Sequence, residues 1–238
     1  MEDAVRTLEL LWGKAPAPRR GPNQTLTVDQ LVTTAIGIAD SAGLKGVTMR
    51  AVGNEVGRTA MSLYTYVPGR EVLITVMHDH VHAEVPAPRK VADWRKAVTA
   101  WCVGLRDMYV RHPWVLEVSQ ARPGFGPHEQ DVLEGLLRLL ARAEVPLAVR
   151  PTVTSALYSI VREAAKRKVE ALAESAQSAE WWAERGKALQ AVAPDFAERY
   201  PESTAIARHQ STQGPQPWIK AAEDAFTGAI TLLLASLE

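Results

Sequence analysis

Residues 59–66 carry small, hydroxyl-bearing and aromatic side chains and no charged one. Serine and threonine hydroxyls can hydrogen-bond either kind of DNA base edge, and the methyl groups of alanine, methionine or threonine can contact a thymine methyl. A tyrosine hydroxyl can also reach a backbone phosphate, although a packed aromatic ring is the alternative for Tyr64. The side chains that could do this chemistry are Thr59, Ala60, Met61, Ser62, Tyr64, Thr65 and Tyr66.

Helix-start signals and glycines surround this segment. Thr27 and Gln30 have the spacing of a capping box, and Gly43 can end the helix that they begin. Thr48 predicts the cap of a second, short helix, whose first amides could also meet a phosphate. Gly57 then predicts a tight turn, and Thr59 the cap of a third helix that closes at 68–69. Two short helices joined by a glycine turn predict a helix-turn-helix whose last helix enters the major groove of DNA.

Three stretches of this region resemble the tetracycline-repressor family of transcriptional regulators. They are AIGIADSAGL at 35–44, VTMRAV at 47–52 and GRTAMSLYTYVPGREVL at 57–73. The resemblance implies that Tyr64 and Arg70 contact the DNA backbone. Two positions depart from the family pattern. Arg58 replaces an apolar residue, which predicts a more open turn or a phosphate contact, and Gly53 replaces alanine, which predicts a slightly loosened second helix.

The C-terminal half resembles the branch of the family closest to the tetracycline repressor itself. The matching segments are DWR at 93–95, RHPW at 111–114, ARPG at 121–124 and AFTG at 225–228. In the tetracycline repressor, a histidine on the short helix chelates drug-bound magnesium. The matching position here is Ser119 or Gln120, which argues against a magnesium–tetracycline effector.

Large side chains are frequent in the helices of this C-terminal half. Trp101 and Leu105 fall on one face of a helix expected over about 92–112, and they could form a packed core or line a ligand pocket. Pockets for drug-sized molecules are mostly apolar with a few polar anchors, and the resemblance favours a pocket. We therefore predict a bulky apolar or aromatic effector of the polyketide-antibiotic type, bound without a metal by Trp101, Leu105, Ser119 and Arg122.

Other reactive side chains predict no catalysis. His78 and His82 share a helix face while His80 points elsewhere, and no nearby carboxylate or cysteine pair completes a metal site. Solvated or pocket-edge histidines are the expectation. Cys102 lies within an apolar helical pattern and is expected to be a packed thiol. No nucleophile elbow or phosphate-binding loop occurs, so no enzyme activity, no cofactor and no metal are expected.

The distribution of charge is more informative than its sum. The net charge of the 238-residue chain is zero, but residues 14–70 hold seven Lys and Arg against three Asp and Glu, and residues 71–238 hold 19 against 21. A basic head on a slightly acidic body fits a protein that reads a DNA sequence without coating nucleic acid. With no apolar run of membrane-spanning length and no signal pattern, the sequence predicts a cytoplasmic protein without a membrane partner.

Three segments are expected along the chain. Residues 1–26 form a short helix and an extended basic arm, residues 27–70 the DNA-binding domain, and residues 71–238 the ligand-binding and dimerisation domain. Arg19 and Arg20 in the arm are placed to enter a minor groove or grip phosphates, a solvated tail being the alternative. Residues 194–217 are polar and proline-rich, which predicts a loop with at most one helical turn.

The interpretation that joins these observations is an all-α protein with a three-helix helix-turn-helix headpiece and a larger helical domain. It is expected to bind a palindromic operator in double-stranded DNA as a homodimer and to leave the operator when a small-molecule effector binds. A repressor is the first expectation, and an activator the alternative within regulation. The alternative from another class is a helical small-molecule binding protein or enzyme with a vestigial helix-turn-helix.

Overall fold

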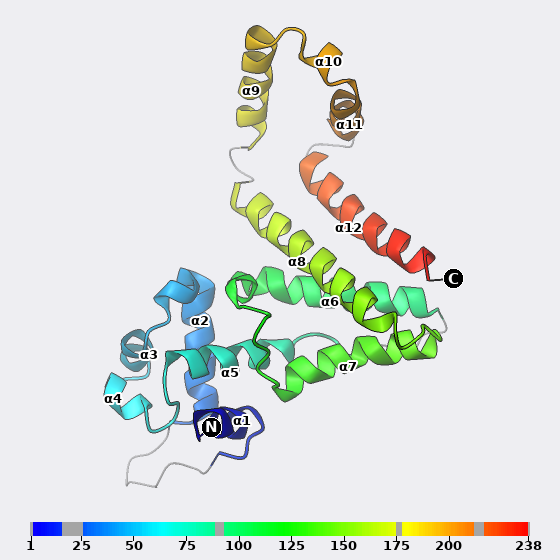
Figure 1. The fold of residues 1–238 in the computed structure, drawn as a ribbon. Helices are drawn as coiled ribbons and strands as arrows, with labels where there is room; N and C mark the ends of the chain where they lie inside the picture. Colours follow the sequence, from blue (N-terminus) through cyan, green and yellow to red (C-terminus); the bar gives the residue numbers. More distant parts are fainter. Residues whose placement is uncertain (1, 16–25, 89–92, 175–177, 212–216, 238) are drawn as a thin grey trace. The chain divides into compact units, whose positions relative to one another are not determined.

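The computed structural model describes residues 2–15, 26–88, 93–174, 178–211 and 217–237, which form helices joined by turns and contain no strand (Figure 1). The all-helical fold predicted from the sequence is therefore confirmed. The chain separates into two compact units, 1–158 and 159–238. The expected domain boundary at residue 70 lies inside the first unit and stays a prediction.

The first five helices of the described residues are α1 (Glu2–Leu11), α2 (Val28–Gly46), α3 (Met49–Glu55), α4 (Ala60–Leu63) and α5 (Arg70–His82). Threonine side chains cap three of them, α2, α3 and α4. The capping box of Thr27 and Gln30 is confirmed, because the Thr27 side chain accepts from the Gln30 amide and the Gln30 side chain accepts from the Thr27 amide. Gly43 has a φ of 68°, which breaks α2 at the predicted residue.

The rest of the first unit surrounds a second part of the core. It comprises α6 (Trp94–Arg111), the short 3-10 helix η1 (Pro113–Glu117), α7 (Pro127–Arg142) and the start of α8 (Arg150–Glu174). Asp93 caps α6 by accepting from the amides of Arg95 and Lys96. The largest fully buried side chains of this part are Met77, Trp101, Leu105, Met108, Tyr109, Trp114, Leu136, Leu140 and Leu157.

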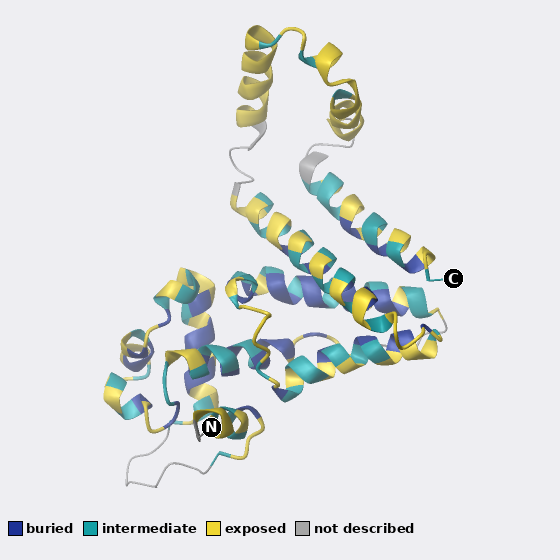
Figure 2. Ribbon diagram, viewed as in Figure 1, coloured by how far each residue is buried: buried dark blue, intermediate teal, exposed yellow. Residues whose placement is uncertain are grey.

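The second unit holds the later part of α8 with α9 (Ser178–Val192), α10 (Phe196–Arg199), α11 (Pro201–Ser211) and α12 (Pro217–Ala235). An ion pair between Lys168 Nζ and Glu223 Oε1, 3.1 Å apart, links α8 to α12. Val161, Phe226 and Ile230 are buried in this unit. By contrast, α10 and α11 bury no residue, and Figure 2 shows α9 and α11 almost wholly exposed.

The expectation of a loop over 194–217 is wrong. Residues 196–199 and 201–211 are helical, and α12 begins at Pro217. The prolines of this segment predict a loop because proline cannot continue a helix. In the structure, however, Pro201 and Pro217 are each the first residue of a helix. Proline is well tolerated there, because the missing amide hydrogen would have no partner within the helix in any case.

Candidate nucleic-acid interface and ligand cavity

The helix-turn-helix is built from local contacts. The Thr48 hydroxyl accepts from the amide of Ala51 at 3.0 Å, and the Thr59 hydroxyl accepts from the amide of Ser62 at 3.4 Å. Both predicted caps are therefore confirmed. The helical part of α4 covers only Ala60–Leu63, and turns continue to residue 66, where the amide of Tyr66 donates to the Leu63 carbonyl.

Gly53 and Gly57 let the chain turn sharply between α3 and α4. Gly57 has a φ of +64°, and the amide of Arg58 donates to the Gly53 carbonyl at 2.8 Å. A Cβ atom on Gly53 would lie 2.7 Å from the Arg58 carbonyl oxygen. The expectation of a more open turn is thus wrong, because the turn passes tightly against α3 at a position without a side chain. The slightly loosened second helix stays a prediction.

The turn presents only some of the candidate base-reading side chains. Met61 is 77% exposed, and Thr59, Tyr64 and Thr65 are also exposed. Ala60 and Ser62 are half-buried. Tyr66 is only 7% exposed, and Leu63 and Val67 are also buried. The structure therefore brings together a reading surface from 59–65 and directs Tyr66 inward.

The arginines that the sequence predicts to contact DNA differ in their surroundings. Arg58 is exposed at the turn. The guanidinium of Arg70 donates from Nε to the Val47 carbonyl and from Nη2 to the Leu44 carbonyl, both at 2.6 Å, so it ties α5 to the turn before α3. Arg19 and Arg20 lie outside the described residues. Sequence reasoning assigned Arg70 to phosphate and missed this structural role, since residues 23 and 26 positions away supply its partners.

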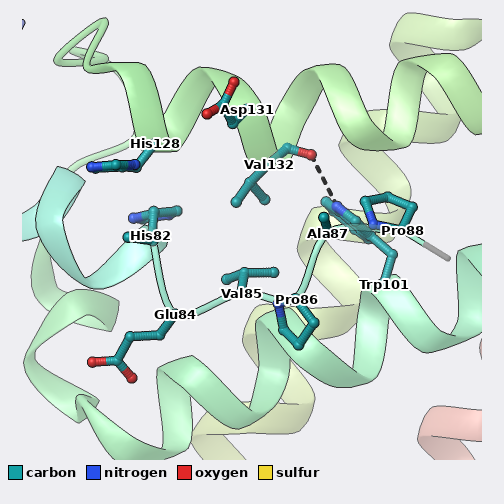
Figure 3. Close-up of a pocket in the computed structure, with 11 residues that line it drawn as sticks. His82, Glu84, Val85, Pro86, Ala87, Pro88, Trp101, His128, Asp131 and Val132 are labelled. Carbon is teal, nitrogen blue, oxygen red and sulfur yellow. Dashed lines mark hydrogen bonds between the residues drawn. The ribbon is translucent and has the colours of Figure 1, made fainter.

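A cavity of about 420 Å³ lies in the same unit, where the end of α5 and the following segment face α6 and α7 (Figure 3). Trp101 forms one wall, and its indole nitrogen donates to the Val132 carbonyl at 2.9 Å. His82, His128 and Asp131 supply polar lining residues, and Glu84 lies in the wall with its carboxylate directed away from Trp101. The remaining lining comes from Ala83, Val85, Pro86, Ala87, Pro88 and Val132.

The sequence-predicted ligand residues are only partly brought together here. Trp101 lines the cavity, whereas Leu105 is fully buried and is not among the lining residues. Ser119 and Arg122 are exposed in the segment after η1 and do not line it either. Sequence reasoning missed His128 and Asp131. Its expectation of pocket-edge histidines fits His82, which lies at the end of α5.

Buried ionisable groups cluster next to this cavity. Asp79 is buried on α5, and its Oδ1 accepts from the amide of Glu129 at 2.9 Å. Burial raises the pKa of both carboxyls, and the charge of Asp79 raises the pKa of Glu129 further. Burial also lowers the pKa of His82, whose Nδ1 lies 2.6 Å from the His78 carbonyl oxygen. Neutral forms of these side chains are therefore favoured inside the core.

The remaining reactive groups fit packing rather than chemistry. Cys102 is buried, and burial raises the pKa of its thiol to about 12, so the expected packed thiol is confirmed. Within the described ranges, no cluster of three His, Cys, Asp or Glu side chains could hold a metal ion. Among the helices described, none is long and apolar enough to cross a membrane.

A second, larger cavity of about 660 Å³ lies between α7 and the start of α8. Its apolar lining comes mainly from Leu133, Leu137 and Leu147, and it has no aromatic lining residue. The smaller cavity is lined by Trp101, two histidines and Asp131, and it offers more of the contacts that orient a drug-sized molecule.

The sequence of the second half places the chain among known proteins. The family model described as the tetracyclin repressor-like, C-terminal domain matches residues 86–238, well over half of the chain. The chain belongs to the tetracycline-repressor family. The resemblance found in the sequence is thereby confirmed.

Relatives in this family are regulators of transcription. The chain is 45% identical over 140 residues to the HTH-type transcriptional repressor DrrR1 of Streptomyces coeruleorubidus, a match covering 58% of this chain and 52% of that protein. It is 29% identical over 119 residues to an HTH-type transcriptional regulator of Saccharopolyspora erythraea, covering 50% of each. The chain thus spans about half the length of the curated relatives that it matches.

Solved structures of the family share the fold over most of the chain. The Streptomyces coelicolor protein ActR in complex with actinorhodin is 25% identical, with a TM-score of 0.73, covering 90% of this chain and 98% of that chain. The regulator SCO7222 of the same organism is 27% identical, with a TM-score of 0.68, covering 89% and 97%.

Proposed function

We propose that this tetracycline-repressor family member is a ligand-responsive repressor that binds a roughly palindromic DNA operator as a homodimer. The observation that carries the proposal is the reading surface at 59–65, held by two threonine caps and the tight turn at Gly53. Its relation to a named transcriptional repressor supports repression rather than activation. The vestigial helix-turn-helix alternative is not favoured, because Met61 and Tyr64 remain exposed.

On the DNA side, we assign base contacts to Thr59, Ala60, Met61, Ser62 and Thr65. We assign phosphate contacts to Tyr64, to Arg58 and to the capped start of α3 at Thr48, which fix register without choosing sequence. Arg19 and Arg20 are assigned to the flanking minor groove or phosphates. Two headpieces in one dimer would read half-sites about one helical turn apart.

On the effector side, we assign the Trp101 cavity to a bulky, partly aromatic molecule bound without a metal. The apolar lining supports this, together with the polar His82, His128 and Asp131 at its edge. The structural neighbour ActR has been crystallised with actinorhodin. Release from DNA requires the effector to bind the DNA-incompetent state more tightly, because only a difference in affinity can shift the equilibrium.

Dimerisation is assigned to the faces of α8 and α12 that pair with the same helices of a second copy. Leu232 on α12 is 75% exposed, whereas Ile230 is fully buried within its own unit. An isolated exposed leucine is common on protein surfaces. Because α12 already buries Ile230 and Phe226, the exposed Leu232 fits a second apolar face that contacts another copy of the chain. Leu232→Glu should therefore give monomers in sedimentation that no longer bind operator. Ser236→Glu, just beyond the helix end, is the matched control and should stay dimeric.

The deciding experiment for the function is a mobility shift of genomic DNA fragments with purified protein. A specific fragment, protected as two symmetric half-sites, is expected to bind. Actinorhodin, used as a first probe, should quench tryptophan fluorescence and release the fragment equally with and without a chelator. Failure of every fragment to bind specifically would contradict the repressor, and a strict magnesium requirement would contradict the metal-free cavity.

A further inference from the structure

His112 bridges the cavity wall and α2, the helix that precedes the helix-turn-helix. It is buried at the end of α6, where its Nδ1 lies 2.7 Å from Asp40 Oδ1 and its Nε2 lies 3.1 Å from Glu84 Oε1. Asp40 belongs to α2, and Glu84 follows α5. One imidazole thus joins two segments that are 44 residues apart in the sequence.

Both ends of this bridge are reinforced. The Trp114 indole donates to the same Asp40 oxygen at 2.8 Å, and Arg111 donates to the second oxygen of Glu84. Each ring nitrogen of His112 thus lies within hydrogen-bond distance of a different carboxylate. Although partial burial alone would raise the pKa of Glu84, the bonds from Arg111 and His112 hold it below its ordinary value. The bridge therefore favours a charged Glu84.

Glu84 also belongs to the wall of the 420 Å³ cavity. Figure 3 shows its carboxylate directed away from Trp101 and Val132, while its neighbours 85–88 face the cavity. This wall rests directly on α6, because a Cβ atom on Gly104 would lie 2.9 Å from Pro86 Cδ. Residue 84 is therefore continuous with the wall that a molecule in this cavity would contact.

At the other end, Asp40 lies three residues before the break of α2 at Gly43. The chain then turns through Leu44 and Val47, whose carbonyls are bonded by Arg70, into the capped start of α3. A shift of Asp40 therefore reaches the helix-turn-helix through a short, hydrogen-bonded path. Discrete hydrogen-bonded contacts of this kind can transmit a preference between two arrangements.

We propose that His112 is a positioning residue that couples the wall of the ligand cavity to α2 through Asp40 and Glu84. This inference rests on the proposed repressor function, and it names the residues that carry its regulation. By reciprocity, operator binding at the headpiece must change the affinity of the cavity for its ligand by the same factor by which the ligand changes operator affinity. Operator DNA is therefore a sufficient probe, and the effector need not be known.

The test is hydrogen–deuterium exchange of the full chain at the amides of 83–85, with and without saturating operator. Asp40→Asn removes the charge but keeps the acceptor oxygen, and His112→Gln removes one donor. Asp29→Asn makes the same change at the exposed start of α2 and is the control. Wild type and the control should show exchange slowed by operator about fivefold or more, the lower end of usual coupling factors. The two bridge variants should bind operator with little or no such slowing.

The outcomes separate this inference from the proposed function. If the mobility shift finds no operator for wild-type protein, the repressor function fails, and the coupling fails with it. If operator binds but leaves 83–85 unchanged in wild type, or slows them equally in all variants, only the bridge is overturned. If His112 and Asp40 only stabilise the fold, their variants should exchange faster than wild type by the same factor with and without operator. That result would also contradict the coupling.

Discussion

The helix-turn-helix and the ligand cavity are built in opposite ways. The reading surface at 59–65 belongs to one continuous stretch, 48–65, held by caps and turns between residues three to five positions apart. The cavity takes its walls from α5, the following segment, α6 and α7, and its neighbouring carboxyls are 50 residues apart. Local construction keeps the spacing of base contacts fixed, whereas construction from distant segments allows a ligand to change how they pack.

Charge differs between the two regions in a way that follows their tasks. The exposed surface at 59–65 has no charged side chain, so the specificity proposed for it would depend on hydroxyl and methyl contacts. The cavity region buries Asp79, His82 and His112, each bonded to backbone or to another side chain. Buried polar networks of this kind specify one arrangement when fully bonded and are sensitive to the loss of any member.

The largest expected effect tests the reading surface directly. The double change Ser62→Ala, Tyr64→Ala should remove a base contact and a phosphate contact, and each good base contact contributes roughly 1–3 kcal/mol. Titrated mobility shifts should show weaker binding to all sequences from Tyr64→Ala and altered base preference from Ser62→Ala or Met61→Ala. Unchanged operator affinity in the double variant would mean that another segment reads the DNA.

The next largest effect tests whether the local turn is as tight as its contacts indicate. Gly53→Ala should destabilise the protein by about 1–3 kcal/mol, since the new Cβ would meet the Arg58 carbonyl oxygen at 2.7 Å. Gly37→Ala on α2 is the control, because nothing lies within 4 Å of its Cβ and alanine favours helix. Chemical denaturation should rank the control above wild type and Gly53→Ala below it. Equal stability of the two variants would contradict the close approach.

A smaller, pH-dependent effect tests the cavity region. Burial raises the folded-state pKa of Asp79 above its unfolded value of 3.8, so its stabilising contribution is present below that value and is lost as pH rises through the folded pKa. Asp79→Asn should raise the melting temperature at pH 7.5 by a few degrees, the shift expected of about 1 kcal/mol. This gain should vanish near pH 4. Asp131→Asn, exposed at the cavity edge, should show no such pH-dependent gain.

The smallest expected effect concerns the arm. Removing residues 1–22 also deletes α1, whose Arg6 donates to the Thr65 carbonyl, so substitution is the cleaner change. Arg19→Ala, Arg20→Ala should lower operator affinity modestly and flatten its salt dependence, because up to two phosphate contacts per subunit would be lost. Fluorescence anisotropy at several salt concentrations measures the slope. An identical affinity and slope would assign the arm to a solvated tail.

The sequence predicted the parts of this protein that are fixed by neighbours along the chain. Thr27 with Gln30, Thr48 and Thr59 are all caps, and Gly43 breaks α2, because capping and positive φ depend on residues within one turn. The loop expected over 194–217 failed for a local reason too, since a proline can begin a helix as well as end one. Whether a proline begins or ends a helix depends on its position in the first turn, and the proline content of a segment does not reveal that position.

Tertiary structure decided what the distant side chains do. Arg70 was assigned to phosphate by resemblance, yet its guanidinium bonds two carbonyls of the preceding turn. Trp101 lines a cavity while Ser119 and Arg122 do not, and His112 joins Asp40 to Glu84. The sequence by itself determined where helices start and which stretch could read DNA, because those depend on short-range backbone chemistry. Only packing determined which buried polar groups meet, because their partners lie 28 to 72 residues away and no periodic pattern records them.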